Sequence, residues 1–201
     1  MMCVIHWKPS MARFVQSRKE ASHERILQAA TRAIRRSGYA GAGVADIMRE
    51  AGLTHGGFYA HFDSREAMLA EAADRAGAET VGTLDGFAAA VPREDAYRTL
   101  LKTYLSSKHK ELVETGCPVA ALGSEMPRQA PDVRHAATRR IKDMIDLVAR
   151  YAPDGGTEAG RRRALTTTAT MIGSLILSRA VDDPQLADDV LAAALEHLTG
   201  E

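Results

Sequence analysis

Apolar side chains recur at helical spacing along almost the whole chain, and this pattern limits the fold more than any other feature. Between about residues 21 and 37, Ile26, Ala30 and Ile34 fall on one face of a helix. No window of six residues alternates apolar and polar side chains as a half-buried strand does. The sequence therefore predicts an all-α protein.

Glycine and proline residues divide this pattern into separate helices. Gly38 is expected to end the first helix, and Asp63 with Glu66 is typical of a capping box that begins the fourth. No internal repeat or low-complexity tract interrupts the series. Helices are predicted at about 21–37, 44–51, 55–62, 63–76, 78–90, 94–114, 118–126, 131–151, 158–181 and 184–199.

Length and composition indicate an ordinary globular protein. The 201 residues, 45% apolar and 26% charged, suffice for one large or two small domains, which excludes a disordered chain or a disulfide scaffold. The two cysteines, Cys3 and Cys117, lie far apart, which favours a reduced, cytoplasmic location. No apolar run approaches the roughly 18 residues of a membrane span, so no membrane partner is expected.

The first ten residues, MMCVIHWKPS, differ from the rest because they hold the only tryptophan and one of the two cysteines. Their apolar stretch is too short for a signal peptide. Met11 offers an alternative start of translation. We expect residues 1–18 to form a disordered extension.

Charge is distributed unevenly although the whole chain is neutral. Residues 1–70 hold ten Lys or Arg and six Asp or Glu, a net charge of +4, and the remainder carries −4. A basic first part favours contact with a polyanion. A chance fluctuation of a mixed surface is the alternative.

The segment Val44–Phe62, VADIMREAGLTHGGFYAHF, combines two short helical patterns with a glycine between them. Gly52 permits the positive φ that ends the first pattern, so the pair is typical of a helix-turn-helix. The second helix of such a motif can enter a DNA major groove. Gly56 and Gly57 cost about 2 kcal/mol early in a helix, which makes sense where the backbone must approach DNA. A plain three-helix subdomain with a glycine loop is the alternative.

Residues 21–75 resemble the DNA-binding domain of the TetR family of bacterial transcriptional regulators. The resemblance rests on ERILQAATRAIRRSGYAGAGVADIMREAGLTHGGFYAHFDSREAML, where the family's Gly, Thr, Tyr, His-Phe and Ser-Arg-Glu positions agree together. It implies a three-helix DNA-binding domain at 19–77, with the helix-turn-helix at about 44–63, and a helical regulatory and dimerisation domain at 78–201. The implied partner is a double-stranded DNA operator.

The same resemblance implies roles for individual residues at the DNA. The first turn of the recognition helix would meet bases and flanking phosphates, and the residues after it would hold the phosphate backbone, helped by the next helix N-terminus. One departure is Gly43, which stands where many family members have a Thr or Ser that caps the second helix. Only the backbone N–H is then left to contact a phosphate there. The candidates are Thr54, His55, Gly56, Gly57, Tyr59, His61, Arg65 and Gly43, with Ser22, His23 and Arg25 at the start of the first helix as weaker ones.

For the second half, the resemblance implies a homodimer and a small-molecule effector of unknown identity. The alternative for the last two helices is that both belong to the core of a monomer. The predicted dimer residues are Leu165, Ile172, Leu175, Ile176, Val190, Leu191, Ala194 and Leu198. The predicted pocket residues are Phe87, Tyr97, Tyr104, Cys117, Met126, Met144, Tyr151 and Met171.

Cys117 is expected to open a helix, where a thiol gains reactivity. A Gly-Cys pair here resembles a subset of family members that sense oxidants or electrophiles, although we favour a packing role for a buried cysteine. A helical binding module without a DNA role is a further alternative. Catalytic motifs such as H-E-x-x-H and the P-loop are absent, and the seven histidines lack ligand spacing. We therefore predict a ligand-responsive repressor with no enzyme activity, cofactor or metal.

Overall fold

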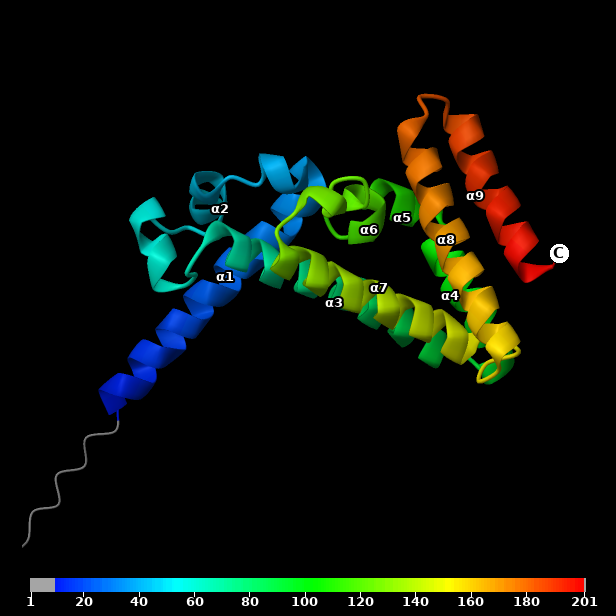
Figure 1. Ribbon diagram of the computed structural model, residues 1–201, viewed down its shortest axis with the longest axis horizontal. Helices are drawn as coiled ribbons and strands as arrows, with labels where there is room; N and C mark the ends of the chain where they lie inside the picture. The colour runs from blue at the N-terminus through cyan, green and yellow to red at the C-terminus, as the bar shows by residue number, and fades with distance from the viewer. Residues whose placement is uncertain (1–9, 201) are drawn as a thin grey trace, which may run out of the picture.

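The computed structural model describes residues 10–200, with side chains from residue 18 onward, and confirms the predicted all-α fold (Figure 1). None of the helices in this part is long and apolar enough to cross a membrane. The elements are α1 (Ser10–Gly41), α2 (Val44–Glu50), the 3-10 helix η1 (His55–Ala60), α3 (Arg65–Ala89), α4 (Arg93–Tyr104), α5 (Ser107–Glu111), α6 (Pro118–Leu122), the 3-10 helix η2 (Met126–Arg128), α7 (Pro131–Tyr151), α8 (Glu158–Ala180) and α9 (Pro184–Thr199).

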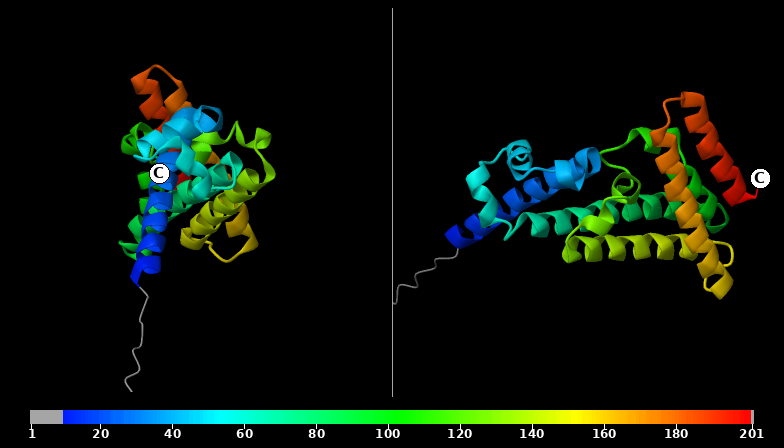
Figure 2. Two further views of the ribbon diagram at one scale, coloured as in Figure 1. Left: turned by 90° about the vertical axis from the view of Figure 1, so that its left-hand side faces the viewer. Right: turned by 45° about the horizontal axis from the view of Figure 1, so that its top comes forward.

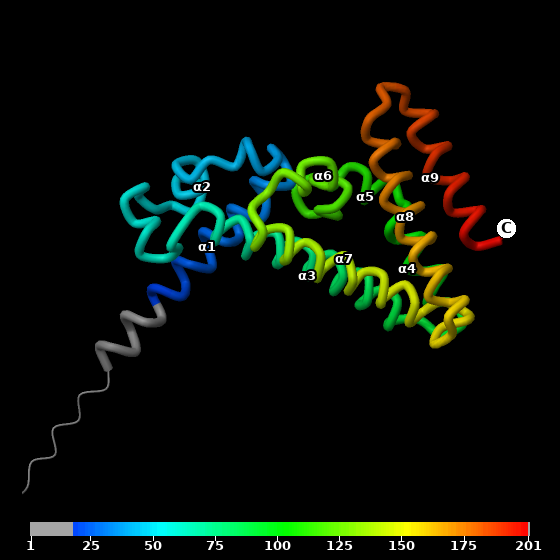
Figure 3. The backbone as a smooth tube through the Cα atoms, viewed as in Figure 1, coloured from blue at the N-terminus to red at the C-terminus, as the bar shows by residue number. Residues whose placement is uncertain are grey.

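Two long helices, α3 and α7, lie side by side along the length of the molecule (Figures 1 and 2). They run in the same direction, because Asp74 pairs with Arg140 at 2.6 Å and the later Asp85 accepts from Tyr151 at 2.8 Å. We call residues 10–76 the head and residues 77–200 the body. The backbone tube shows η1 at the head end and the α8–α9 hairpin at the opposite end (Figure 3).

The head core forms where α1, α2, η1 and the start of α3 meet. Ile26 and Ile34 from α1 and Phe58 from η1 are completely or almost completely buried in it. Leu122 of α6 and Val133 of α7 belong to the same cluster, so the body closes one side of the head core. A second core cluster, the body core, joins the second half of α3 with α4, α7, α8 and α9.

Glycines set the turns of the head as the sequence predicts. Gly38 has a φ of +73° and breaks α1 near its end, and Gly52 has a φ of +69° and ends the turn after α2. The N-cap of α3 differs from the prediction. It is Ser64 rather than Asp63, and its hydroxyl accepts from the N–H of Ala67 at 3.0 Å.

Several helix boundaries also differ from those predicted. The first helix begins at Ser10 rather than near 21, so part of the predicted extension is helical, while residues 1–9 lie outside the described part. α3 continues through the expected break at 76–78, and the predicted domain boundary lies inside it. The predicted helix 94–114 is divided, because the Ser106 hydroxyl caps a new helix by accepting from the N–H of His109 at 3.1 Å.

Candidate DNA-binding surface and effector cavity

The helix-turn-helix consists of α2, the turn at Gly52 and η1. Phe58 anchors η1 from the inside, since its ring is 1% exposed and stacks on Phe62 at 5.7 Å between ring centres. Tyr59 next to it points outward and is 73% exposed. The short η1 is a 3-10 helix rather than the α-helix that its apolar spacing predicted.

The outward side of η1 carries the residues predicted to meet bases. Thr54, His55 and Gly56 are exposed, and Gly57 is half-buried. A Cβ added at Gly56 would meet nothing within 4 Å, and one at Gly57 would make only ordinary contact with Met48, at 3.8 Å. The fold itself therefore does not require glycine at these positions, and close approach to DNA stays the prediction for them.

His61 lies behind this surface in a cluster with His23. The His23 ring stacks on Phe62 at 4.4 Å, and its Nε2 lies 2.9 Å from a carboxylate oxygen of Glu71. Nδ1 of His61 is buried without a hydrogen-bond partner among the described residues. Burial, followed by the nearby charges of His23 and Lys19, lowers the pKa of His61, so the ring is neutral at pH 7.

Arg65 turns inward from the predicted phosphate position. Its guanidinium donates to the carbonyl oxygen of Tyr39, and also to that of Ala42 at 3.4 Å, so it ties the start of α3 to the turn after α1. A phosphate contact by Arg65 stays a prediction that depends on its remaining N–H groups. Gly43 is the N-cap of α2, but its N–H donates to the Gly41 carbonyl at 3.0 Å and is not the free donor we expected.

The weaker candidates on α1 also change their setting. With α1 beginning at Ser10, Ser22 and Arg25 lie along the helix and not at its start. Arg25 is exposed and donates to the Ser22 hydroxyl at 3.3 Å. Any contact of these residues with a phosphate therefore relies on side chains, without the dipole of a helix N-terminus.

Charged side chains join the head to the body near the end of α1. Arg35 is 3% exposed, and it donates to the Glu79 carboxylate at 2.9 Å, the Ala76 carbonyl at 2.7 Å and the Glu114 carbonyl at 3.4 Å. Arg36 donates to the Glu114 carboxylate at 3.1 Å. Glu114, in the segment between α5 and α6, thus holds two arginines of α1.

A second polar contact fixes the turn that follows. The N–H of Tyr39 donates to the Glu125 carboxylate at 2.9 Å, and burial together with this carboxylate raises the pKa of Tyr39 to about 12. A Cβ at Gly38 would lie 2.3 Å from Glu125 Oε1, so glycine is needed both for its φ and for this approach. We call the contacts of Arg35, Arg36 and Tyr39 with the body the polar junction.

A cavity of about 370 Å³ lies beside the polar junction. It is formed by α3, α4, α5 and residues 112–116, the segment that contains Glu114. Leu84, Phe87 and Leu112 supply apolar surface, and Lys108 and His109 are the ionisable residues that line it in the described part of the chain. Among the described residues, no group of three or more His, Cys, Asp or Glu side chains could hold a metal ion.

Comparisons with known proteins agree with this geometry. The family described as "Bacterial regulatory proteins, tetR family" matches residues 26–72. The HTH-type transcriptional regulator LmrA of Bacillus subtilis is 29% identical over 163 residues, which cover 78% of this chain and 86% of LmrA. Residues 26–72 thus form a TetR-family DNA-binding domain. The chain is accordingly a DNA-binding transcriptional regulator.

Solved TetR-family structures share the fold over nearly the whole chain. A regulator from Chloroflexus aurantiacus aligns with a TM-score of 0.76 at 24% identity, over 92% of this chain and 95% of its own. One from Agrobacterium tumefaciens gives 0.75 at 20% identity, over 89% and 98%. The reduced form of E. coli NemR gives 0.73 at 19% identity, over 89% and 95%.

The predicted pocket residues of this chain are not brought together. Phe87 alone lines the cavity. Tyr97 and Tyr151 bond through their hydroxyls to Thr167 at 3.1 Å and Asp85 at 2.8 Å. Met126 packs against the head core, whereas the body core contains Tyr104, Cys117, Met144 and Met171. The prediction selected apolar and aromatic side chains, which the fold uses mainly for packing; the signal it missed was the hydroxyl and lysine content of α3–α5.

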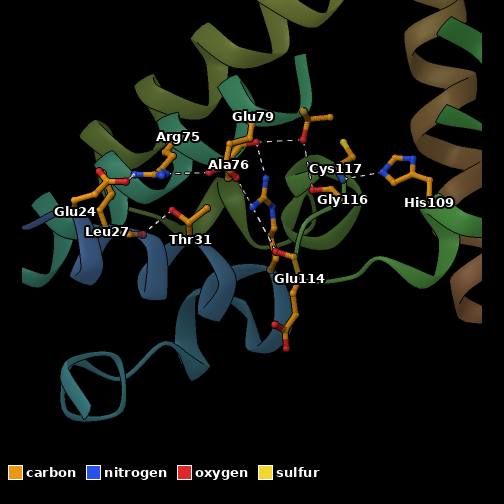
Figure 4. Close-up of polar contacts among 12 residues, drawn as sticks. Glu24, Leu27, Thr31, Arg75, Ala76, Glu79, His109, Glu114, Gly116 and Cys117 are labelled. Carbon is orange, nitrogen blue, oxygen red and sulfur yellow. Dashed lines mark hydrogen bonds and ion pairs between the residues drawn. The ribbon is translucent and has the colours of Figure 1, made fainter. Parts of the chain in front are cut away.

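Cys117 is the N-cap of α6, as predicted, and is 2% exposed within the body core. Its N–H donates to Nε2 of His109 at 3.0 Å (Figure 4). Nδ1 of the same ring lies 2.7 Å from the Tyr104 carbonyl oxygen. Both ring nitrogens are thus engaged. Burial lowers the pKa of His109, so the ring is neutral at pH 7. This setting agrees with the packing role that we favoured for Cys117.

The predicted dimer residues divide into two groups. Leu175, Leu191 and Ala194 are buried in the body core of the protomer, so they are not available at its surface. Ile172, Val190 and Leu198 are half-buried, and Leu165 and Ile176 are exposed. The sequence prediction did not include Leu177 and Leu186, which are also exposed.

Proposed function

We propose that this regulator is a homodimeric repressor whose two heads bind a palindromic operator and release it when a small molecule occupies the cavity. Both helix-turn-helix heads would enter successive major grooves about 34–36 Å apart. The small molecule would bind more tightly to a dimer whose heads are wrongly spaced for the operator than to a correctly spaced one. Operator affinity would then fall by the difference between these two ligand affinities. Such a regulator acts where bacterial DNA lies, in the cytoplasm.

The observation that carries the proposal is the outward face of α8. The inward face of this helix includes four hydroxyl residues, Thr167, Thr168, Ser174 and Ser178. Leu165, Ile176 and Leu177 face outward and are between 41% and 57% exposed. Large apolar residues that gather exposed on one face of a helix mark a contact with another protein surface. A second copy of α8, related by a twofold axis, is the partner that we infer for this face.

The polar junction supports the effector response. Residues 112–116 form part of the cavity, and Glu114 within this segment binds Arg35 and Arg36 of α1. A molecule that moves the segment would therefore change the hydrogen bonds that hold the head. α1, whose arginines bind Glu114, also packs against α2 of the helix-turn-helix. Elements in direct contact therefore connect the cavity with the DNA-binding surface.

The experiment is a titration of DNA fragments from upstream of the chain's own reading frame, followed by fluorescence anisotropy and footprinting. We expect one fragment to bind two protomers on two half-sites, and a scrambled duplex of equal composition to bind far more weakly. Equal affinity for both duplexes would contradict sequence-specific repression.

The dimer needs a separate test by sedimentation. Replacing both Ile176 and Leu177 with lysine should give monomers, because two charges then lie in an apolar contact. Phe87→Lys, at an exposed residue on α3, serves as the matched control and should remain a dimer. A dimer that survives the Ile176 and Leu177 changes would show that α8 is not the contact.

A further inference from the structure

The cavity beside residues 112–116 combines exposed apolar side chains with a lysine, Lys108. Phe87 is 54% exposed and Leu112 is 44% exposed, and both line this one cavity. Large apolar residues gathered in a concave site are typical of ligand binding rather than of a bare surface. The volume of about 370 Å³ suits a small organic molecule.

Lys108 gives the cavity its charge. No Asp or Glu lines it, and the Lys108 ammonium forms no ion pair within the described part of the chain. His109, the other ionisable residue, uses both ring nitrogens on the backbone of Tyr104 and Cys117. It therefore offers its ring and not a nitrogen to a ligand. An anionic group would find one partner here, the Lys108 ammonium.

Hydroxyl groups complete the lining. Thr80 and Thr103 donate their hydroxyl protons to the carbonyls of Ala76 and Thr99, so their oxygens remain available as acceptors. Such oxygens suit the N–H or O–H groups of a ligand. The Ser106 hydroxyl also lines the cavity, but its oxygen already accepts from the His109 N–H at 3.1 Å. The lining thus has apolar surface, acceptors and one cation, without a carboxylate to repel an anion.

We propose that this cavity binds a small amphipathic organic anion, with its apolar ring against Phe87 and Leu112 and its anionic group at Lys108. The proposal rests on the effector response proposed above and names the chemical class of the effector. The bound molecule lies against residues 112–116, so it contacts the segment that Arg35 and Arg36 hold.

The test uses two fluorescent probes with the same aromatic skeleton, of which one carries a sulfonate group and the other does not. These are 8-anilinonaphthalene-1-sulfonate and its neutral counterpart N-phenyl-1-naphthylamine, each titrated into the full chain without DNA. Lys108→Gln should weaken the sulfonate about fivefold, equal to about 1 kcal/mol, and the neutral probe less than twofold. Lys102→Gln, on an exposed residue of α4 outside the cavity, is the control and should change neither.

A second pair of variants tests the apolar part of the site. Leu112→Asn should weaken both probes about tenfold, since the residue supplies apolar surface to each. Phe87→Ser should do the same and replaces Leu112→Asn if circular dichroism shows that the latter is unfolded. Equal losses at Lys108 and Lys102, or probe binding unaffected by both apolar changes, would overturn the proposal.

The result is independent of the repressor test, because no DNA is present. Failure of the probes with intact operator binding rejects the ligand class alone. Loss of operator specificity with intact probe binding rejects the repressor proposal alone. A sulfonate signal that grows on dilution would show that a second copy covers the cavity, which also overturns the inference.

Discussion

The contacts within the body and those of the polar junction are made by different kinds of side chain. Within the body, the helices meet through buried leucines such as Leu100, Leu147 and Leu191. Between α1 and the body, the buried cation of Arg35 reaches a carboxylate and two carbonyls. Hydrogen bonds can exchange partners at little net cost, whereas separating apolar side chains exposes their area to water. We therefore expect the body to move as one unit and the polar junction to change.

Removing the buried charge of Arg35 should cause the largest loss of stability. Arg35→Met removes the charged donor to the Ala76 carbonyl and one of the two arginines at Glu79, the other being Arg75, so it should lower the free energy of unfolding by about 3 kcal/mol. Arg36→Met, at the exposed neighbour, should cost at most about 1 kcal/mol. Urea denaturation measures both, and equal losses would show that burial does not distinguish the two arginines.

A clash within the body tests whether α3 and α7 behave as one unit. A Cβ at Gly77 would lie 2.3 Å from the Cβ of Arg140, so Gly77→Ala should cost about 2 kcal/mol. Gly82→Ala in the same helix meets open space and should stabilise by up to about 1 kcal/mol. If the two variants unfold at the same temperature, the α3–α7 contact can adjust to the added methyl group, and the two helices do not behave as one rigid unit.

Replacing Gly56, on the outer side of the head, should stabilise the protein, whereas replacing Gly77 should destabilise it. Gly56→Ala adds a methyl group that nothing in the protein opposes, so the free energy of unfolding should rise by up to about 1 kcal/mol. The same methyl would meet DNA, and operator affinity should fall about tenfold, equal to about 1.4 kcal/mol. Unchanged affinity in anisotropy titrations would remove Gly56 from the DNA contact.

The smallest expected effect is a pH dependence from the body. Burial lowers the pKa of His109, so the unfolded chain binds a proton there at a higher pH than the folded one. Stability from this group is present above the unfolded pKa of about 6.5 and is lost as pH falls through the folded pKa. The loss stays below about 1.4 kcal/mol per pH unit. His109→Gln should flatten this slope between pH 7 and 5, and an unchanged slope would assign the dependence to other groups.

Local signals in the sequence were sufficient for most of the head. Gly38 and Gly52 have positive φ angles, and Phe58 packs inward from η1, because these features depend on near neighbours. The cap of α3 was misplaced by one residue, since Asp63 and Ser64 are both good caps. The 3-10 form of η1 was also missed, because two glycines weaken an α-helical preference that apolar spacing cannot measure.

The polar junction and the cavity depend on contacts that are distant in sequence. Nothing near Arg35 indicates that its partners are Glu79 and Glu114. The predicted pocket residues lie apart for a related reason, since a list of aromatic and apolar residues does not tell which ones the core uses. In α8, the spacing of the apolar residues likewise does not tell that Leu175 faces inward while Leu177 faces outward.

The outward face of α8 has a consequence for how the protein persists in a cell. If a second copy covers it, part of the folding free energy appears only on association and depends on concentration. A tenfold rise in protein then adds about 1.4 kcal/mol per dimer. Freshly made subunits at low abundance would spend more time exposed to proteases, whereas abundant ones would survive longer. The amount of this regulator would thus influence its own lifetime as well as the occupancy of its operator.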